Sequence, residues 1–150
     1  MKLVFAASSG GHYEQLMMLK PLMERHDSCV VTEKTSYNAK SDIRTYYMVQ
    51  VNRKELLVIP KMIVNSIRAL RILRKEKPDA IICTGVLAMI PLCILGKKKG
   101  CKLIYLESFA KVTSATLSGK LLYKYADRFY VQWESMLEIF PDAVYKGGIY

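Results

Sequence analysis

The 150-residue sequence predicts an α/β fold, a Rossmann-like parallel sheet with helices on both faces. Short, continuously apolar segments alternate with segments whose apolar residues recur at helical spacing. The apolar segments lack the polar–apolar alternation of a half-exposed sheet, so we expect helices to cover both of its faces. The sequence contains no repeat, low-complexity segment or linker, and residues 1–150 are therefore expected to form a single domain.

Strands are expected in the first half of the chain at residues 2–7, 28–33 and 43–51. The first is a continuous apolar run, and the third is rich in aromatic and β-branched residues. Between the second and third strands, the polar residues 34–42 predict a loop. After the first strand, Leu16, Leu19 and Met23 recur at helical spacing and predict a helix that Pro21 kinks or restarts.

The segment 61–77 has the pattern of a basic amphipathic helix. Ile63, Ile67, Leu70 and Leu73 belong to its apolar face, whereas Arg68 and Arg71 mark another face. We expect the apolar face to pack on the core and the basic side chains to be solvated, and a position on an anionic membrane surface is the alternative.

The second half of the chain is expected to contain strands at 79–85, 101–108 and 128–132 and helices at 86–99, 118–126 and 135–140. In the helix at 86–99, Met89, Leu92 and Ile94 and their apolar neighbours cover almost the whole circumference, and lysines follow at its end. We expect this helix to be partly exposed and to lie on an anionic membrane surface.

The net charge of +10 favours an anionic partner, which is a nucleic acid, an acidic lipid or a phosphorylated ligand. The high aliphatic and methionine content favours a membrane surface, because nucleic-acid binders more often combine arginine with exposed aromatic residues. We expect no nucleic-acid partner, although a nucleotide- or nucleic-acid-binding domain stays open as an alternative.

The longest apolar stretch, residues 86–96, is too short to span a bilayer and contains Pro91. The first residues lack the apolar region of a signal peptide, so attachment to a membrane is expected to be peripheral. The four cysteines are far apart and form no C-x-x-C pair. We expect reduced thiols, with neither disulfides nor a metal site.

Right-handed crossovers place the strand-to-helix loops along one edge of such a sheet, where ligands bind in doubly wound folds. The first of these loops is the sequence Ser8, Ser9, Gly10, Gly11 and His12. Glycines permit positive φ and close approach of a ligand, and the first N–H groups of the following helix favour an anion. The pattern is neither a dinucleotide-binding fingerprint nor a P-loop, so no cofactor is expected.

The glycines alone are equally consistent with a tight turn and with an anion site. The position of His12 favours the anion site, where a neutral imidazole serves as a base and a charged one donates to a phosphate. The second and third loops contain Thr84 and Gly85, and Glu107, Ser108 and Phe109, respectively. Glu107 is either a helix-cap or ion-pair carboxylate or a ligand for sugar hydroxyls. His26 lies at the opposite edge and is assigned no role.

Four stretches of the sequence together resemble a known family: SSGGH, ICTGVLAMIPLC, LIYLESFAKVTSATLSGKLLYKYADRFYVQW and FPDAVYKGGIY. The family is that of the membrane-associated, acceptor-side subunits of two-component UDP-sugar glycosyltransferases. The chain is similar to a bacterial capsule or exopolysaccharide relative of the eukaryotic subunit that recruits a UDP-N-acetylglucosamine transferase to the endoplasmic reticulum. The resemblance extends over essentially the whole chain.

The resemblance implies the N-terminal half of a split, inverting GT-B glycosyltransferase, which is inactive without a partner subunit that binds the UDP-sugar. The acceptor would be an undecaprenyl-diphosphate-linked saccharide at the cytoplasmic face of the cell membrane. Residues 8–12 would bind its diphosphate, and Thr84, Gly85 and residues 107–109 would line the acceptor-sugar cleft. His12 and Glu107 are the expected catalytic residues. The alternative is a non-catalytic enhancer that recruits and activates the partner. The tail, residues 144–150, is expected to dock this partner or a second copy.

Overall fold

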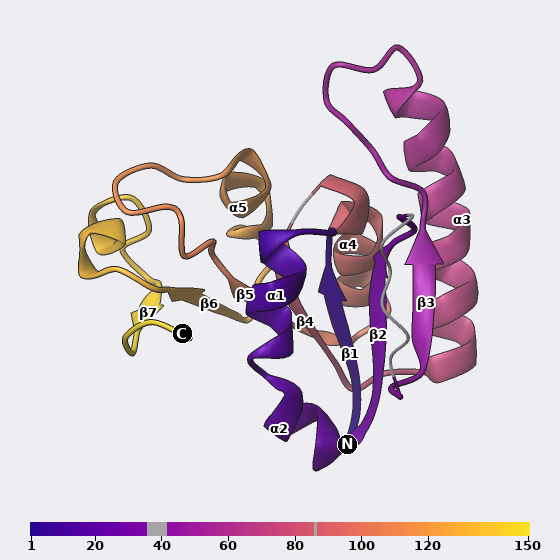
Figure 1. The fold of residues 1–150 in the computed structure, drawn as a ribbon, viewed down its shortest axis with the longest axis horizontal. Coiled ribbons are helices and arrows are strands. Elements are labelled where there is room, and N and C mark those ends of the chain that lie inside the picture. Colours follow the sequence, from indigo (N-terminus) through magenta and orange to yellow (C-terminus); the bar gives the residue numbers. More distant parts are fainter. Residues whose placement is uncertain (36–41, 86) are drawn as a thin grey trace.

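The computed structural model describes residues 1–35, 42–85 and 87–150, which contain a seven-stranded parallel sheet (Figure 1). The strands are β1 (Lys2–Ala7), β2 (Asp27–Glu33), β3 (Thr45–Met48), β4 (Ala80–Gly85), β5 (Lys102–Leu106), β6 (Arg128–Val131) and β7 (Val144–Tyr145). Their order in the sheet is β3-β2-β1-β4-β5-β6-β7, and every neighbouring pair is parallel. The predicted fold class is confirmed.

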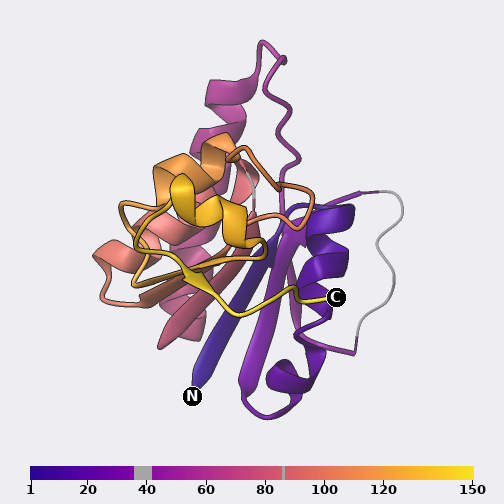
Figure 2. The ribbon, with the colours of Figure 1, turned by 90° about the vertical axis from the view of Figure 1, so that its left-hand side faces the viewer.

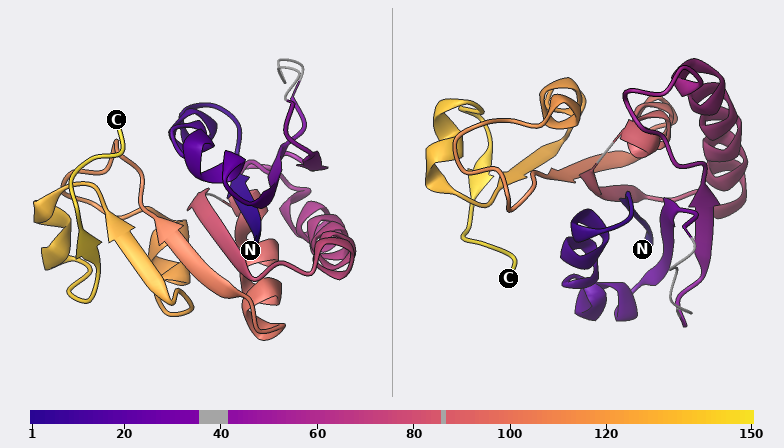
Figure 3. Two further views of the ribbon diagram at one scale, coloured as in Figure 1. Left: turned by 90° about the horizontal axis from the view of Figure 1, so that it is seen from below. Right: turned by 45° about the horizontal axis from the view of Figure 1, so that its top comes forward.

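Helices cover both faces of the sheet, as Figure 3 shows from two further directions. One face carries α1 (Gly11–Met17) and α2 (Lys20–Glu24), and the other carries α3 (Val58–Glu76), α4 (Ile90–Lys98) and α5 (Leu117–Leu122). Short 3₁₀ turns, η1 (Leu87–Met89) and η2 (Glu134–Glu138), complete the secondary structure.

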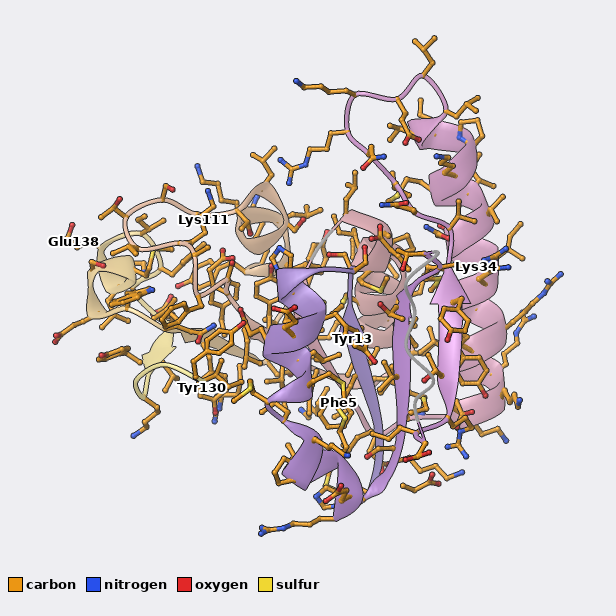
Figure 4. All side chains as sticks on the ribbon, in the orientation of Figure 1. Phe5, Tyr13, Lys34, Lys111, Tyr130 and Glu138 are labelled. Carbon is orange, nitrogen blue, oxygen red and sulfur yellow. The ribbon has the colours of Figure 1, made fainter. Side chains whose placement is uncertain are left out.

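Alternate residues of the strands form two separate hydrophobic cores. Val4 and Ala6 of β1 belong to the core beneath α3, α4 and α5. Leu3 and Phe5 belong to the core beneath α1 and α2, where Leu16 and Met23 pack on them; Figure 4 labels Phe5 on this side. Because successive residues of a strand point to opposite faces, a continuously apolar strand supplies both cores.

Several element boundaries differ from the predicted ones. The first helix is interrupted as expected, since α1 ends at Met17 and α2 begins at Lys20, next to Pro21. β3 is shorter than the predicted strand, α5 ends at Leu122, and the last predicted helix is the 3₁₀ turn η2. The two-residue strand β7 is too short to show a pattern in the sequence. Residues 36–41 of the predicted loop and residue 86 of the predicted helix lie outside the described residues.

The prediction that the helix at 86–99 is partly exposed and lies on a membrane is wrong. Ala88, Met89, Leu92 and Cys93 each have 0% of their surface exposed. They belong to the core that α3, α5 and the sheet share with α4. A helix that is apolar around its whole circumference is stable where protein surrounds it, and α4 is enclosed in this way.

The prediction of which α3 side chains face the core is wrong for the first half of the helix. Ile63 and Ile67, expected to be buried, are 56% and 47% exposed. Leu73, expected on the same apolar face, is buried as predicted, together with Ala69 and Ile72. The helix is therefore amphipathic, as predicted, but retains apolar residues on its outer face.

None of the helices in the described part of the chain has both the length and the hydrophobicity required to cross a membrane. The four cysteines, which are all among the described residues, are buried free thiols. This agrees with the expected absence of a disulfide framework.

The opposite environments of α4 and α3 lead to a stability prediction. Replacement of the buried Leu92 by alanine (Leu92→Ala) is expected to lower the free energy of unfolding by about 2–5 kcal/mol, because it leaves a cavity in the core. The exposed Ile63 is the matched control, and Ile63→Ala is expected to change stability by no more than about 0.5 kcal/mol. Denaturant unfolding monitored by circular dichroism measures both values. Equal effects of the two substitutions would contradict the assignment of α4 to the core.

Candidate functional site

The three loops predicted to form the site lie side by side. Residues 8–12 follow β1, Thr84 and Gly85 end β4, and residues 107–109 follow β5. These strands are adjacent and parallel in the sheet, so their carboxyl ends meet at one edge. The fold thus brings together all of the residues that the sequence proposed for the site.

Two reciprocal hydrogen bonds join His12 to Thr84. The Nδ1 atom of His12 lies 2.8 Å from the carbonyl oxygen of Thr84, and the hydroxyl of Thr84 donates to the carbonyl oxygen of His12 at 2.7 Å. A carbonyl oxygen only accepts hydrogen bonds, so Nδ1 carries the hydrogen atom. In the neutral imidazole, Nε2 then has the free lone pair.

Gly85 provides the space that the imidazole occupies. Its φ angle is +116°, and a Cβ atom at this position would lie 3.1 Å from Nδ1 of His12. Its carbonyl oxygen also accepts a hydrogen bond of 2.8 Å from the backbone N–H of Ser8. A larger residue would therefore disturb both the histidine and the start of the glycine turn.

The glycine turn is open on its outer side. Gly10 has a φ of +79°, and neither Gly10 nor Gly11 has another group within 4 Å of the position of a Cβ atom. The carbonyl oxygen of Gly10 accepts from the N–H groups of Tyr13 and Glu14, which begins α1. A ligand can therefore approach the backbone of the turn closely.

Glu33, at the end of β2, binds the glycine turn through hydrogen bonds with Ser9. One carboxylate oxygen accepts from both the N–H and the hydroxyl of Ser9, at 3.2 and 3.1 Å. The other accepts from the N–H of Val51 at 3.3 Å. Ser8 is buried, and the donors of Ser9 are bound by Glu33, so both serines shape the turn. Glu33 was not predicted as a site residue; its place at the carboxyl end of a predicted strand is the signal that would have identified it.

The carboxylate of Glu107 is enclosed. Only 1% of the residue is exposed, and its oxygens accept from the N–H of Ser108 at 2.8 Å and from the hydroxyl of Thr116 at 2.9 Å. The hydroxyl of Thr116 in turn accepts from the N–H of Gly119 and caps α5. A Cβ atom on Gly119 would lie 2.0 Å from the Glu107 carboxylate. Glu107 therefore supports the capping residue Thr116 from within the protein and is not itself the cap of α5.

Two buried glutamines connect α1 and β6 to the loop after β5. The side chain of Gln15 donates to the carbonyl oxygen of Glu107 at 3.3 Å and accepts from the N–H of Phe109 at 3.1 Å. Gln132 donates to the same carbonyl oxygen at 2.9 Å. Neither glutamine was predicted; a glutamine in an otherwise apolar segment was the available signal.

The tail lies against its own chain in this structure. The N–H of Ile149 donates to Gln132 at 2.9 Å, and the ring of Tyr150 contacts that of Phe109 with centroids 5.0 Å apart. The ring of Trp133 also contacts that of Phe109, in a tilted arrangement with centroids 5.0 Å apart, and its Nε1–H donates to the carbonyl oxygen of Phe109 at 2.7 Å. Phe109, half-buried, is thereby fixed at the margin of the site.

Two ionisable groups beneath the site, the Tyr105 hydroxyl and the Cys93 thiol, have raised pKa values, which favour their protonated forms. Burial, and secondarily the charge of Glu107, raises the pKa of the Tyr105 hydroxyl well above its usual value. A hydrogen bond with Cys83 and burial likewise raise the pKa of the Cys93 thiol. In the ranges that the structure describes, no cluster of histidine, cysteine or carboxylate residues could hold a metal ion. In its neutral form, the half-buried His12 offers the lone pair of Nε2 for proton transfer.

Comparisons with known proteins identify the family and the fold of the chain. Residues 3–149 match the family model described as oligosaccharide biosynthesis protein Alg14 like. The UDP-N-acetylglucosamine transferase subunit ALG14 of Yarrowia lipolytica is 30% identical to this chain over an alignment 172 residues long. The alignment covers 97% of this chain and 80% of that protein.

Solved structures with the same fold include MurG from Acinetobacter baumannii, with a TM-score of 0.72 and 16% identity over 90% of this chain. UDP-N-acetylglucosamine 2-epimerase from Rickettsia bellii superimposes on 99% of the chain, with a TM-score of 0.73 and 14% identity. The chain spans only 43% and 45% of these two proteins, and at such identities the likeness shows the fold alone. The match along nearly the whole sequence shows that the chain belongs to the Alg14-like family of oligosaccharide biosynthesis proteins.

Proposed function

We propose that this chain is the acceptor-side subunit of a two-component, inverting glycosyltransferase. A separate chain would bind the UDP-sugar, and this chain would be inactive alone. The name of the Yarrowia relative, which is a transferase subunit, supports this proposal. So does the fold, which corresponds to less than half of MurG. The acceptor we propose is an undecaprenyl-diphosphate-linked saccharide of capsule or exopolysaccharide synthesis, at the cytoplasmic face of a membrane to which the protein binds peripherally.

The observation that carries the proposal is the orientation of His12. Its Nδ1 atom is held by Thr84, so that Nε2 is the nitrogen available to a substrate. The acceptor hydroxyl would give its proton to Nε2 while its oxygen attacks the anomeric carbon of the donor sugar. The bond from this carbon to UDP breaks at the same time, and UDP leaves with the electron pair. The proton on Nε2 would pass to water before the next turnover.

The open glycine turn is the proposed site for the acceptor diphosphate. Gly10 and Gly11 let an anionic group approach the backbone next to His12. Ser8 and Ser9 would act indirectly, because Ser8 is buried and Ser9 is bound to Glu33. His12 is then either the base or a phosphate ligand, and its free Nε2 favours the base.

The acceptor sugar would lie between the ends of β4 and β5. The partly exposed Ser108 and Phe109 would form this cleft, and the buried Thr84 and Gly85 would contribute to it by positioning His12. We propose a positioning role for Glu107 in place of the catalytic role expected from the sequence. Its buried carboxylate holds Ser108 and Thr116 and therefore shapes the loop that the sugar would contact.

A non-catalytic enhancer is the second candidate function. The burial of Glu107 favours it, because it leaves His12 as a single proposed catalytic residue on this chain. In that case the partner would contain the complete active site, and this chain would recruit and activate it.

Substitution of His12 separates these two functions. In the reconstituted pair, His12→Asn keeps a donor for the Thr84 carbonyl but removes Nε2, and we expect kcat to fall by about 100-fold or more. His12→Ala should have the same effect. His26→Ala, in the loop before β2, is the matched control and should leave kcat unchanged. Sugar transfer is measured with radiolabelled UDP-sugar, and complex formation by size-exclusion chromatography. Full turnover by an intact complex containing His12→Asn would establish the enhancer function.

Substitution of Glu107 tests its positioning role. Glu107→Gln replaces one accepting oxygen by a donor in a buried network, and we expect it to lower the free energy of unfolding by about 1–3 kcal/mol. Hydrogen exchange should accelerate at Ser108 and Thr116, and the KM for the acceptor should rise more than kcat falls. Glu138→Gln, at an exposed position, is the control. Unchanged exchange and stability, with kcat alone greatly reduced, would instead identify Glu107 as catalytic.

A further inference from the structure

The N-terminal half of α3 and the residues before it expose a cluster of aliphatic side chains. Leu56 is fully exposed, and Ile59 is 73% exposed. Ile59, Ile63 and Ile67 follow one another at four-residue spacing along one side of the helix. The cluster, which we call the α3 patch, consists of Leu56, Leu57, Ile59, Ile63, Val64 and Ile67.

The α3 patch is not needed to attach α3 to the domain. The opposite side of the helix packs on the core through residues such as Ala69, Ile72 and Leu73. Asn65, which is buried, also binds both the N–H and the carbonyl oxygen of Val49, at 2.8 and 2.9 Å. The patch is therefore presented on a helix already fixed from behind, and a contiguous exposed apolar surface of this kind marks an interaction site.

Basic residues surround the α3 patch. Arg53 and Lys54 precede it and are exposed, and Arg71 and Arg74 follow it on the outer face of the helix. Both acidic residues of this part of the chain are paired. Glu55 binds Lys61, and the carboxylate of Glu76 binds Arg44 at 2.8 Å. An apolar centre flanked by cations is complementary to an anionic membrane surface.

The α3 patch projects beyond the edge of the sheet that contains the candidate site. In Figures 1 and 2, the N-terminal end of α3 and the segment leading into it extend past the carboxyl ends of the strands. His12 follows β1 at this same edge. A planar surface touching the patch would therefore lie on the side of the molecule to which the glycine turn opens.

We propose that the α3 patch inserts into the interface of a bilayer that contains anionic lipid, with the surrounding arginines and lysines contacting lipid phosphates. This rests on the proposed function, in which the acceptor is itself anchored in a membrane. The patch is purely aliphatic and protrudes, whereas the centres of protein interfaces are enriched in tryptophan, tyrosine and arginine. The patch takes the membrane-contacting role that the sequence had suggested for the buried α4.

Vesicle flotation tests this proposal with the full chain. The protein is mixed with vesicles of phosphatidylcholine alone or of phosphatidylcholine with phosphatidylglycerol. We expect flotation with the anionic vesicles, and a fall in affinity of about tenfold or more for Leu56→Ser/Ile59→Ser, because two inserted side chains are lost. The matched control is Met18→Ser/Leu22→Ser, which changes two exposed apolar residues, one directly after α1 and one in α2; this variant should bind as the unsubstituted chain does.

A second pair of variants tests the charges. Arg53→Gln/Lys54→Gln should weaken binding to the anionic vesicles by about tenfold at low salt, since each cation near the surface contributes. Lys98→Gln/Lys99→Gln, at the end of α4, is the control with the same loss of charge. If the two double variants lose the same amount of affinity for the anionic vesicles, the attraction depends on net charge alone. That result would overturn the proposed surface.

Other results of the flotation experiment would also overturn the proposal. One is that the unsubstituted protein does not float with the vesicles. Another is that the Leu56→Ser/Ile59→Ser and Met18→Ser/Leu22→Ser variants float equally. Loss of self-association or of partner binding in Leu56→Ser/Ile59→Ser without loss of flotation also overturns it, because the patch is then a protein interface. Transfer to a water-soluble acceptor in the reconstituted pair should be unchanged in this variant. If the unsubstituted pair transfers no sugar while the flotation pattern holds, the proposed function fails and the membrane surface stands.

Discussion

The paired hydrogen bonds between His12 and Thr84 are the interaction on which the candidate site depends. They connect the first turn of α1 to the last residues of β4, which are 72 positions apart in the sequence. They also set the tautomer of the imidazole, because the partner of Nδ1 is a carbonyl oxygen. Gly85 is required for this contact, since a Cβ atom there would press on the ring. The end of β4, including Gly85, and the start of α1 are thus held together as one structural unit.

Two buried carboxylates stabilise the loops around this unit. Glu33 binds the backbone and side chain of Ser9, and Glu107 binds the backbone of Ser108 and the side chain of Thr116. Buried charges of this kind are stable only when hydrogen bonds satisfy them, and N–H and hydroxyl donors do so here. Negative charge behind the proposed anion site would oppose the binding of a diphosphate. The compensating positive potential would come from the start of α1 and from the net charge of +10.

The fold and the grouping of the three loops were predictable, because continuously apolar strands imply a parallel sheet and its carboxyl edge collects the strand-to-helix loops. The burial of α4 could not be predicted in this way. Its apolar residues show that the helix is hydrophobic on all sides, but they do not show whether protein or a membrane covers it. The same holds for Ile63 and Ile67, which share a pattern with core residues yet face outward. Glu33 and Gln15 were missed because their partners are distant in sequence; Gln15 binds Phe109, 94 residues away. Glu107 is enclosed by Thr116 and Gly119. The sequence around Glu107 does not predict that these two residues contact it.

The central claim is that Thr84 binds Nδ1 of His12 and leaves Nε2 free beside the proposed diphosphate site. Nitrogen-15 NMR of the histidine side chains tests it directly, and the chain contains only two histidines to assign. In the neutral imidazole of His12, we expect Nδ1 to carry the hydrogen and Nε2 to have the shift of an unprotonated nitrogen. Addition of inorganic diphosphate should move the Nε2 resonance and the amide resonances of Gly10 and Gly11, and leave His26 unchanged. A hydrogen on Nε2 instead of Nδ1, or no response of His12 and the glycine amides to diphosphate, would contradict the account.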